Sequence, residues 1–249
     1  MWKNRIARRL LALAVCAVLL VLAPCAVADD LDRFQPYTDV DLSVFRDAGY
    51  TVYYDQYAFS AELGMPEGSK IEAKTDTSTY MPSTCTVRFD VKIVYSAGKA
   101  VVIPRIIFGE EGYNNYAYRM GTIYIKNGEN RYTVTATNSS RSVDSKNYSA
   151  TESTVQPLYL VGCYILQDMA EHGQVISMQL TSYKGAFTFT AADNAVLKSF
   201  YDTCKKAGVF EQEYLLTHTD NYRILTQFNE GSTGQESPEE EPAPETPAT

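Results

Sequence analysis

The chain has 249 residues, with 22 Lys and Arg against 30 Asp and Glu, and its net charge is −8. Residues 1–28 carry four of the basic residues and no acid, so the remainder carries 18 against 30, or −12. An acidic surface repels phosphate backbones and anionic lipid, so we expect no nucleic acid partner and no binding to a membrane surface.

The first 28 residues have the pattern of a secretory signal peptide. Basic residues precede an apolar run over 10–22, and Ala26, Val27 and Ala28 then form an AxA cleavage site. A run of 13 residues is short for a membrane span, which needs about 20, so an uncleaved anchor is the weaker alternative. Cys25 follows a lipobox-like segment, but Pro24 replaces the small residue that a lipoprotein has there. We expect cleavage after Ala28, a secreted or cell-surface protein, and no stable membrane insertion after cleavage.

Residues 29–230 predict a single domain built mainly from strands. In CTVRFDVKIVY, at 85–95, apolar residues alternate with polar ones, which indicates a strand with one buried face. A turn at 96–99 leads into AVVIPRIIF, whose Pro104 cannot donate to a ladder and so favours a sheet edge or a bulge. The segment YTVYYDQYAF near 50–59 predicts an earlier strand.

Hairpin and helix signals follow in the second half. Asn127 and Gly128 separate two β-rich runs, VISMQLTSYKGAFTF suggests a second hairpin, and NYRILTQF predicts a last strand. A helix opens with the capping-box pair Thr190 and Asp193 and closes at Gly208, and a shorter one runs from about 165 to 172. We therefore predict an antiparallel β-sandwich with one or two short helices.

The segment 165–204, ILQDMAEHGQVISMQLTSYKGAFTFTAADNAVLKSFYDTC, has the order short helix, strand, hairpin strand and helix ending in Cys. This order resembles secreted β-sandwich proteins of the invasion-associated locus B family. The resemblance covers about 40 of the 249 residues. It implies a β-sandwich fold and supplies no catalytic residues.

Two polar segments lie outside the predicted strands. Residues 231–249, GSTGQESPEEEPAPETPAT, contain four prolines and five glutamates, and we expect a disordered, extended spacer because little apolar surface is available to offset ordering. Residues 138–149, NSSRSVDSKNYS, predict a flexible, solvated connection.

Three cysteines remain after cleavage: Cys85, Cys163 and Cys204. An odd number at wide spacing is no disulfide framework, and no CxxC motif is present for zinc. Cys85 falls on the inward face of a strand and Cys204 on the apolar stripe of a helix, which predicts buried, inert thiols. Because exported proteins can form disulfides, one disulfide between two of these three cysteines stays an alternative.

Short motifs give no catalytic residue, metal site or cofactor. Asp168, Glu171 and His172 imitate an inverted zinc helix motif, but Asp168 stands where the first His is required, which favours an exposed helix end. The SxxK match at 96–99 falls in a turn and not at a helix start. Glu110 and Glu111 are adjacent and point apart, whereas sugar hydrolysis needs two facing carboxyls, so a solvated loop is the better interpretation.

The segment 109–120, GEEGYNNYAYRM, predicts a 12-residue connection between two strands. Long loops in compact domains are often functional, and tyrosines beside amides suit contact with a protein or glycan. Tyr is also common in strands, so the cluster has an ordinary explanation. Oxygen ligands in the same loop leave a Ca²⁺ site as an alternative. The candidate ligand-binding residues are Tyr113, Asn114, Asn115, Tyr116 and Tyr118.

The sequence therefore favours a non-enzymatic extracellular module that binds a protein or a glycan. With only two His residues and no nucleophile motif, an enzyme is the weaker interpretation. A secreted hydrolase whose carboxylates come from distant segments remains the first alternative, and a structural component of the cell envelope the second.

Overall fold

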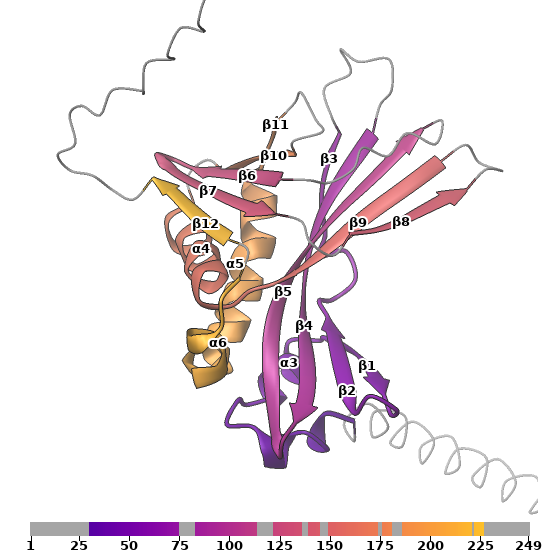
Figure 1. The fold of residues 1–249 in the computed structure, drawn as a ribbon, viewed down its shortest axis with the longest axis vertical. Coiled ribbons are helices and arrows are strands. Elements are labelled where there is room, and N and C mark those ends of the chain that lie inside the picture. Colours follow the sequence, from indigo (N-terminus) through magenta and orange to yellow (C-terminus); the bar gives the residue numbers. More distant parts are fainter. Residues whose placement is uncertain are drawn as a thin grey trace, which may run out of the picture.

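A computed structural model describes residues 30–74, 83–113, 122–135, 139–144, 149–173, 176–180, 186–220 and 222–226. These residues form two antiparallel sheets (Figure 1). The large sheet contains β1 (Thr51–Asp55), β2 (Ser60–Gly64), β3 (Ile71–Lys74), β4 (Ser83–Ser96), β5 (Lys99–Tyr113), β8 (Ser139–Asp144) and β9 (Ser149–Pro157). Its order is β1-β2-β4-β5-β9-β8, with β3 also paired to β4.

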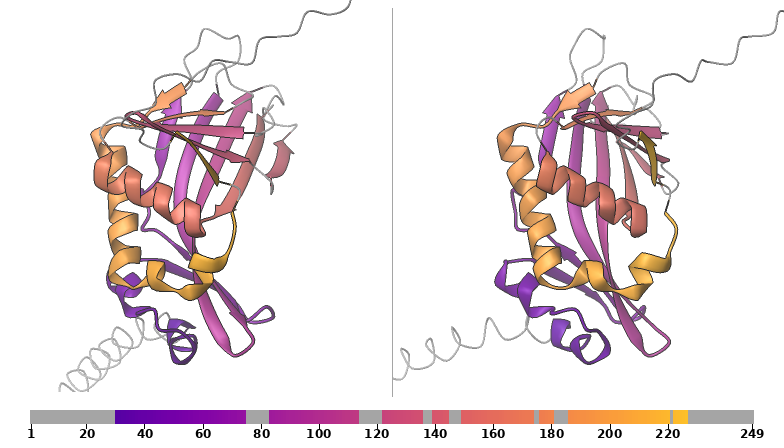
Figure 2. Two further views of the ribbon diagram at one scale, coloured as in Figure 1. Left: turned by 60° about the vertical axis from the view of Figure 1, so that its left-hand side comes forward. Right: turned by 90° about the vertical axis from the view of Figure 1, so that its left-hand side faces the viewer.

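The small sheet has the order β11-β10-β6-β7-β12. Its strands are β6 (Thr122–Asn127), β7 (Asn130–Thr135), β10 (Ile176–Leu180), β11 (Ala186–Thr188) and β12 (Tyr222–Thr226). The helices are α3 (Ser43–Asp47), α4 (Leu160–His172), α5 (Ala191–Lys206) and α6 (Glu213–Thr217), with 3-10 turns η1 (Gln35–Tyr37) and η2 (Val209–Glu211). The mainly β, antiparallel fold class predicted from the sequence is confirmed, and Figure 2 shows α4 and α5 together on one face of the large sheet.

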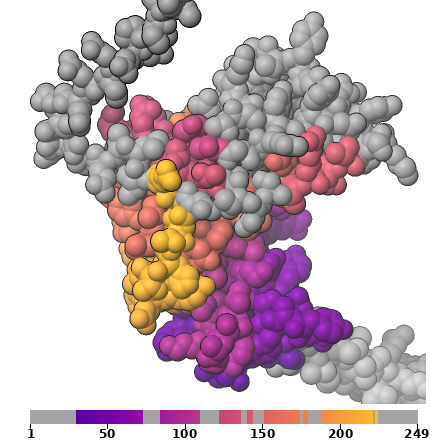
Figure 3. Space-filling view, viewed as in Figure 1, coloured from indigo at the N-terminus to yellow at the C-terminus, as the bar shows by residue number. Residues whose placement is uncertain are grey.

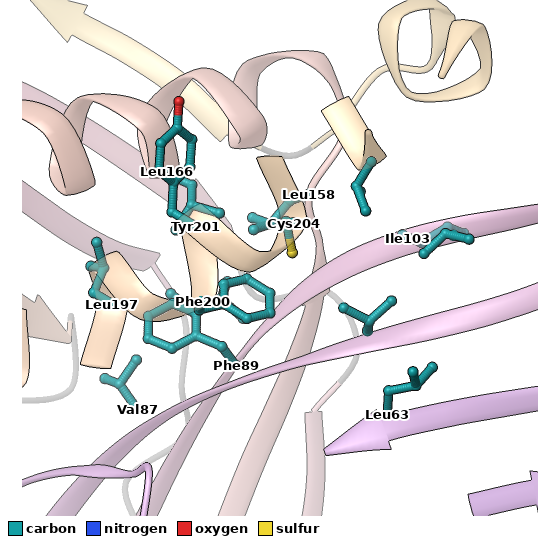
Figure 4. Packing of buried hydrophobic residues seen from close by; sticks show 14 of the residues in the cluster. Leu63, Val87, Phe89, Ile103, Leu158, Leu166, Leu197, Phe200, Tyr201 and Cys204 are labelled. Atoms are coloured by element: carbon teal, nitrogen blue, oxygen red, sulfur yellow. The ribbon is translucent and has the colours of Figure 1, made fainter. Parts of the chain in front are cut away.

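The core lies between the large sheet and these helices. Alternate residues of β4 from Cys85 to Ile93 are buried, as the period of two predicts. Phe89 of β4 stacks on Phe200 of α5 with ring centroids 5.1 Å apart, and Leu197 lies beside them (Figure 4). The opposite face of the large sheet is therefore free of α5.

Several local predictions are confirmed. Helix α5 begins with a capping box, because the amide of Asp193 donates to the Thr190 hydroxyl and Asp193 accepts from the Thr190 amide. The β6–β7 turn contains Gly128 at a φ of 59°, which glycine adopts without strain. Helix α4 ends at His172 as predicted but begins at Leu160, five residues before the expected start.

Pro104 lies inside a long strand that is central over most of its length. Strand β5 pairs with β4 along its whole length and with β9 from Arg105 onward, so the prediction of an edge strand is wrong for the strand as a whole. On the side of β5 away from β4, the Val102 amide donates to the Gln212 side chain, which in turn donates to the Val102 carbonyl oxygen. Backbone groups two residues apart in a strand point to the same side, so the backbone nitrogen of Pro104 also faces away from β4. The proline therefore removes no bond from the β4–β5 ladder.

A polar segment that lacks a strand pattern forms β8, because its backbone pairs with the neighbouring strand β9. Residues 139–144 form β8, so the prediction of a flexible connection over 138–149 is wrong for that part, although residues 140–143 are exposed to solvent as expected. Six residues of β8 pair with β9, although no apolar alternation marks the segment. Backbone pairing to an existing edge is sufficient to order such a strand.

Candidate functional site

The first five residues of the predicted binding loop lie in a strand. Residues 109–113 continue β5, paired with β4 and β9, because ladder bonds on both sides hold a polar segment extended. The expectation of a 12-residue loop is therefore wrong for this part. Tyr113 ends β5 opposite Ser149, whereas Asn114, Asn115, Tyr116 and Tyr118 lie outside the described residues.

The adjacent acids Glu110 and Glu111 are strand residues, and the prediction of a loop is wrong for them. In the ladders Glu110 lies opposite Cys85 and Glu152, and Glu111 lies opposite Thr84 and Thr151. Both residues thus take part in the backbone ladders of β5.

A groove of about 450 Å³ lies on the face of the large sheet that points away from α5. Directly paired residues share a face, and the register brings Val94 opposite Val101, Lys92 opposite Ile103, and Arg105 opposite Pro157. The sheet residues of the groove are Lys92, Val94, Ser96, Val101, Ile103, Arg105, Val155 and Pro157, and Tyr159 and Tyr214 complete it from outside the sheet. Its volume is within the range of small-ligand and peptide sites.

One side of the groove carries a compact ionic cluster. The guanidinium of Arg105 donates through Nε, at 2.7 Å, and Nη2 to the two oxygens of Asp90, and through Nη1 to Glu62 at 3.1 Å. Lys92 Nζ lies 3.7 Å from the same Glu62 oxygen. Arg105 and Asp90 are buried, so their pairing offsets the cost of removing both charges from water.

The pKa values of this cluster follow from its contacts. The hydrogen bond from Arg105 lowers the pKa of Glu62, against a smaller opposing effect of burial. Burial alone would lower the pKa of Arg105, but bonding to Asp90 and then to Glu62 outweighs it and raises that pKa. Burial raises the pKa of Asp90, while both of its oxygens are occupied by the guanidinium. The charged groups of the cluster are thus paired with one another, and we call them the tied charges of the groove.

The opposite rim of the groove is aromatic. Tyr214 of α6 stacks on His218 with centroids 3.7 Å apart, and the Tyr159 ring meets Tyr214 edge to face at 6.2 Å. His218 Nδ1 lies 2.6 Å from the Tyr214 carbonyl oxygen, which fixes the stack. One face of Tyr214 is therefore already covered.

The start of α4 determines the position of Tyr159, since Tyr159 is the N-cap residue of that helix. It offers no side-chain cap, and Asp220 instead accepts from the Gly162 amide at 2.7 Å. Asp220 lies just before β12, far from α4 in the sequence. This distant cap explains why α4 begins at Leu160, earlier than the local sequence predicts. In Figure 3 the C-terminal residues of α6 and β12 (yellow) lie at the surface beside α4.

At its other end α4 is anchored by Asp168. This buried carboxylate accepts from the Tyr132 hydroxyl at 2.6 Å, from Asn127 Nδ2 at 2.8 Å and from Asn130 Nδ2 at 3.2 Å. Burial, then the hydrogen bond to Asp168, raises the pKa of Tyr132, so its hydroxyl remains a donor. The prediction of an exposed helix end is therefore wrong for Asp168, which is a buried structural anchor, and is confirmed for Glu171 and His172, which are exposed. His172 Nδ1 lies 3.5 Å from Asp168.

The described residues contain no arrangement that suggests metal or nucleophile chemistry. No group of three or more His, Cys, Asp or Glu side chains among them can hold a metal ion. Ser96 lines the groove but ends a strand, opposite exposed Lys99 in the register. The thiols of Cys85 and Cys204 are buried as predicted, Cys163 is half-buried, and these three cysteines form no disulfide in the described part of the chain.

Sequence reasoning missed the groove because its residues come from four separate segments. One signal was present: AVVIPRIIF is apolar at consecutive positions, so this strand has apolar side chains on both faces. A strand of that kind requires cover on both faces. The pairing that collects Val94, Ile103 and Val155 on the outer face appears only in the register.

No helix in the described part of the chain has the length and apolar character needed to cross a membrane. The chain matches no protein-family model, no curated protein and no solved structure.

Proposed function

We propose that this chain is an exported, non-enzymatic binding module that holds an extended segment of a partner protein in the groove. The observation that carries the proposal is an apolar groove of about 450 Å³ with an aromatic rim on one side and tied charges on the other. Apolar contacts supply affinity, and a few placed polar groups supply orientation. Export rests on the leader-like sequence of residues 1–28.

A polypeptide fits this groove better than a sugar does. Glycan recognition requires many unsatisfied donors and acceptors together with open aromatic faces. Here the strand positions are largely aliphatic, the carboxylates of Asp90 and Glu62 already bond to Arg105, and His218 covers one face of Tyr214. Apolar side chains of a peptide need no such groups.

The groove does not favour the hydrolase alternative. A glycosidase requires one carboxyl group that remains protonated and another that acts as nucleophile or base. The pKa of Glu62 is lowered, and both oxygens of Asp90 accept from the same guanidinium. Neither carboxyl is available to transfer a proton to a substrate.

The tyrosine loop stays a second candidate surface for a protein or glycan. Tyr113 lies at the end of β5, and the amides and tyrosines after it keep the composition that motivated the prediction. A separate variant therefore tests it.

The test is binding of the mature chain, residues 29–249, to a random peptide array and a glycan panel. Tyr214→Ala removes an aromatic ring of the groove. Tyr124→Ala is the matched control, because the two tyrosines are exposed to a similar extent, Tyr214 to 37% and Tyr124 to 43%, but Tyr124 lies on β6 of the small sheet and not at the groove. We expect peptide binding that Tyr214→Ala weakens about tenfold or more, as for an aromatic contact residue, and that Tyr124→Ala retains.

Two binding results contradict the groove proposal alone. One is peptide binding that both variants retain. The other is binding lost only when Tyr113, Tyr116 and Tyr118 are changed to Ala, which would transfer the function to the loop. A chain that binds no peptide and no glycan would contradict both surfaces.

A further inference from the structure

We propose that the Pro- and Glu-rich segment 237–248 of this same chain docks in the groove and that a partner must displace it. The inference rests on the proposed function, because it names a competitor for the same site. The sequence alone suggested a spacer; the groove gives this segment a place to bind.

The segment is rich in proline, as polyproline II ligands are. Three of its four prolines, Pro238, Pro244 and Pro247, are spaced by multiples of three and would share one face of a helix with three residues per turn, and Pro242 falls outside that spacing. Such segments are extended before binding and lose little entropy on docking, and they bind in grooves lined by aromatic residues. Tyr159 and Tyr214 beside Pro157 provide that lining here.

The charges on the two surfaces are complementary. Residues 236–245 carry five glutamates and no cation. Among residues whose side chains are described, the outer face of β4 and β5 carries Arg88, Lys92, Lys99 and Arg105 against Asp90, with Glu62 of the neighbouring β2 beside them, a net positive charge on an otherwise acidic chain. Lys92 is only weakly engaged, since its contact with Glu62 is 3.7 Å long and its side chain is 38% exposed. Glutamates beside the prolines can pair with it.

The chain is long enough for this contact. Strand β12 ends at Thr226, and Pro238 follows after a connection that spans at most about 40 Å when extended. A domain of roughly 200 residues has a radius of gyration of about 17 Å, so the segment can reach either face of the large sheet.

Tethering makes weak affinity sufficient. A flexible tether gives an effective concentration of about 1 mM, at which a segment with a Kd of about 0.1 mM fills the groove in roughly nine molecules of ten. A partner then binds about tenfold more weakly than it would to an empty groove. The tail would thus reserve the groove for ligands that bind more tightly than the chain's own segment.

A single tryptophan can report occupancy, because Trp2 is the chain's one Trp and lies in the leader-like segment. Tyr214→Trp places a fluorophore at the groove rim of the mature chain, and Tyr124→Trp places a control on β6. Each is prepared with the natural tail and with Pro238, Pro244 and Pro247 changed to Ser. The readout is quenching by acrylamide.

For Tyr214→Trp we expect the natural tail to lower quenching by about half or more relative to the Pro→Ser tail, as near-complete occupancy requires. A synthetic peptide of residues 231–249 should restore the protection to the Pro→Ser protein, and Tyr124→Trp should not respond to either change. The inference is overturned if both tails give equal quenching at Tyr214→Trp and the peptide has no effect. It is also overturned if protection depends on protein concentration, because a second copy would then supply the tail.

The peptide array distinguishes this inference from the proposed function. If the natural tail gives no protection and the natural and Pro→Ser proteins bind array peptides at the groove equally tightly, only the inference is overturned. If neither protein binds a peptide at the groove, the proposed function falls as well.

Discussion

Removing the carboxylate of Asp168 should strongly destabilise the domain. Asp168 is buried on α4 and holds three side chains of the β6–β7 hairpin. Asp168→Ala leaves the Tyr132 hydroxyl and the Asn130 amide without this acceptor, whereas Asn127 keeps its bond to the backbone carbonyl of residue 168 at 3.1 Å. Because water reaches this site poorly, the lost bonds are not replaced.

The magnitude follows from the two orphaned donors. Each buried donor without a partner costs about 1–3 kcal/mol, so Asp168→Ala should lower the free energy of unfolding by about 2–6 kcal/mol. A domain typically has about 5–15 kcal/mol in total, so the loss is a large fraction of its stability. Combining Asp168→Ala with Tyr132→Phe should cost less than the sum of the single changes by about 1 kcal/mol or more, since Phe removes one orphaned donor.

Urea denaturation of the mature chain at pH 7, followed by circular dichroism, measures these changes. Asp202→Ala is the control, because Asp202 pairs with Lys198 on the exposed side of α5 and should matter by less than about 0.5 kcal/mol. A loss below about 1 kcal/mol for Asp168→Ala, or strict additivity with Tyr132→Phe, would refute the account of α4 anchoring.

Three further changes follow from the structure. Ala97→Asn should raise the free energy of unfolding by about 0.5–1 kcal/mol, since Ala97 has a φ of 51° in the β4–β5 turn, where Asn is better tolerated; an unchanged melting temperature would contradict this. Gly162→Ala should lower the free energy of unfolding by about 1–2 kcal/mol, although Ala favours helices, because the new Cβ would lie 3.1 Å from the Asp220 oxygen that caps α4. A higher urea midpoint for this variant would contradict the prediction. Hydrogen bonds from Lys205 and then Tyr201 lower the pKa of Glu171 to about 2 from 4.5, so its stabilising effect is complete above about pH 5 and is lost as the pH falls toward 2. Glu171→Gln should therefore differ from the natural chain at pH 6 and converge with it at pH 2, and a constant difference between them would exclude this role.

Local patterns in the sequence were sufficient for much of the fold. The alternation in β4 predicted its buried face, the Thr190–Asp193 pair predicted the start of α5, and Gly128 predicted the β6–β7 turn. Each of these signals acts over a few residues, through side-chain period, capping or turn geometry. They are therefore legible in a single chain.

Long-range pairing accounts for the errors. Residues 109–113 and 139–144 are polar and carry no strand pattern, yet they are held by ladders with β4 and β9. The start of α4 depends on Asp220, 58 positions from the amide that it caps. Nothing within the local sequence of these segments identifies the partner.

The sequence by itself determined a mainly β domain between a leader-like segment and an acidic, proline-rich tail, because composition and period are properties of the chain alone. It also determined that the thiols of Cys85 and Cys204 would be buried. Only the tertiary structure decided where a ligand can bind. The groove forms when the registers of β4, β5 and β9 align apolar residues on the outer face and the contacts of α4 and α6 bring Tyr159 and Tyr214 to its rim. Such an alignment joins residues more than 100 positions apart in the chain, such as Lys92 and Tyr214, and local sequence patterns do not determine it.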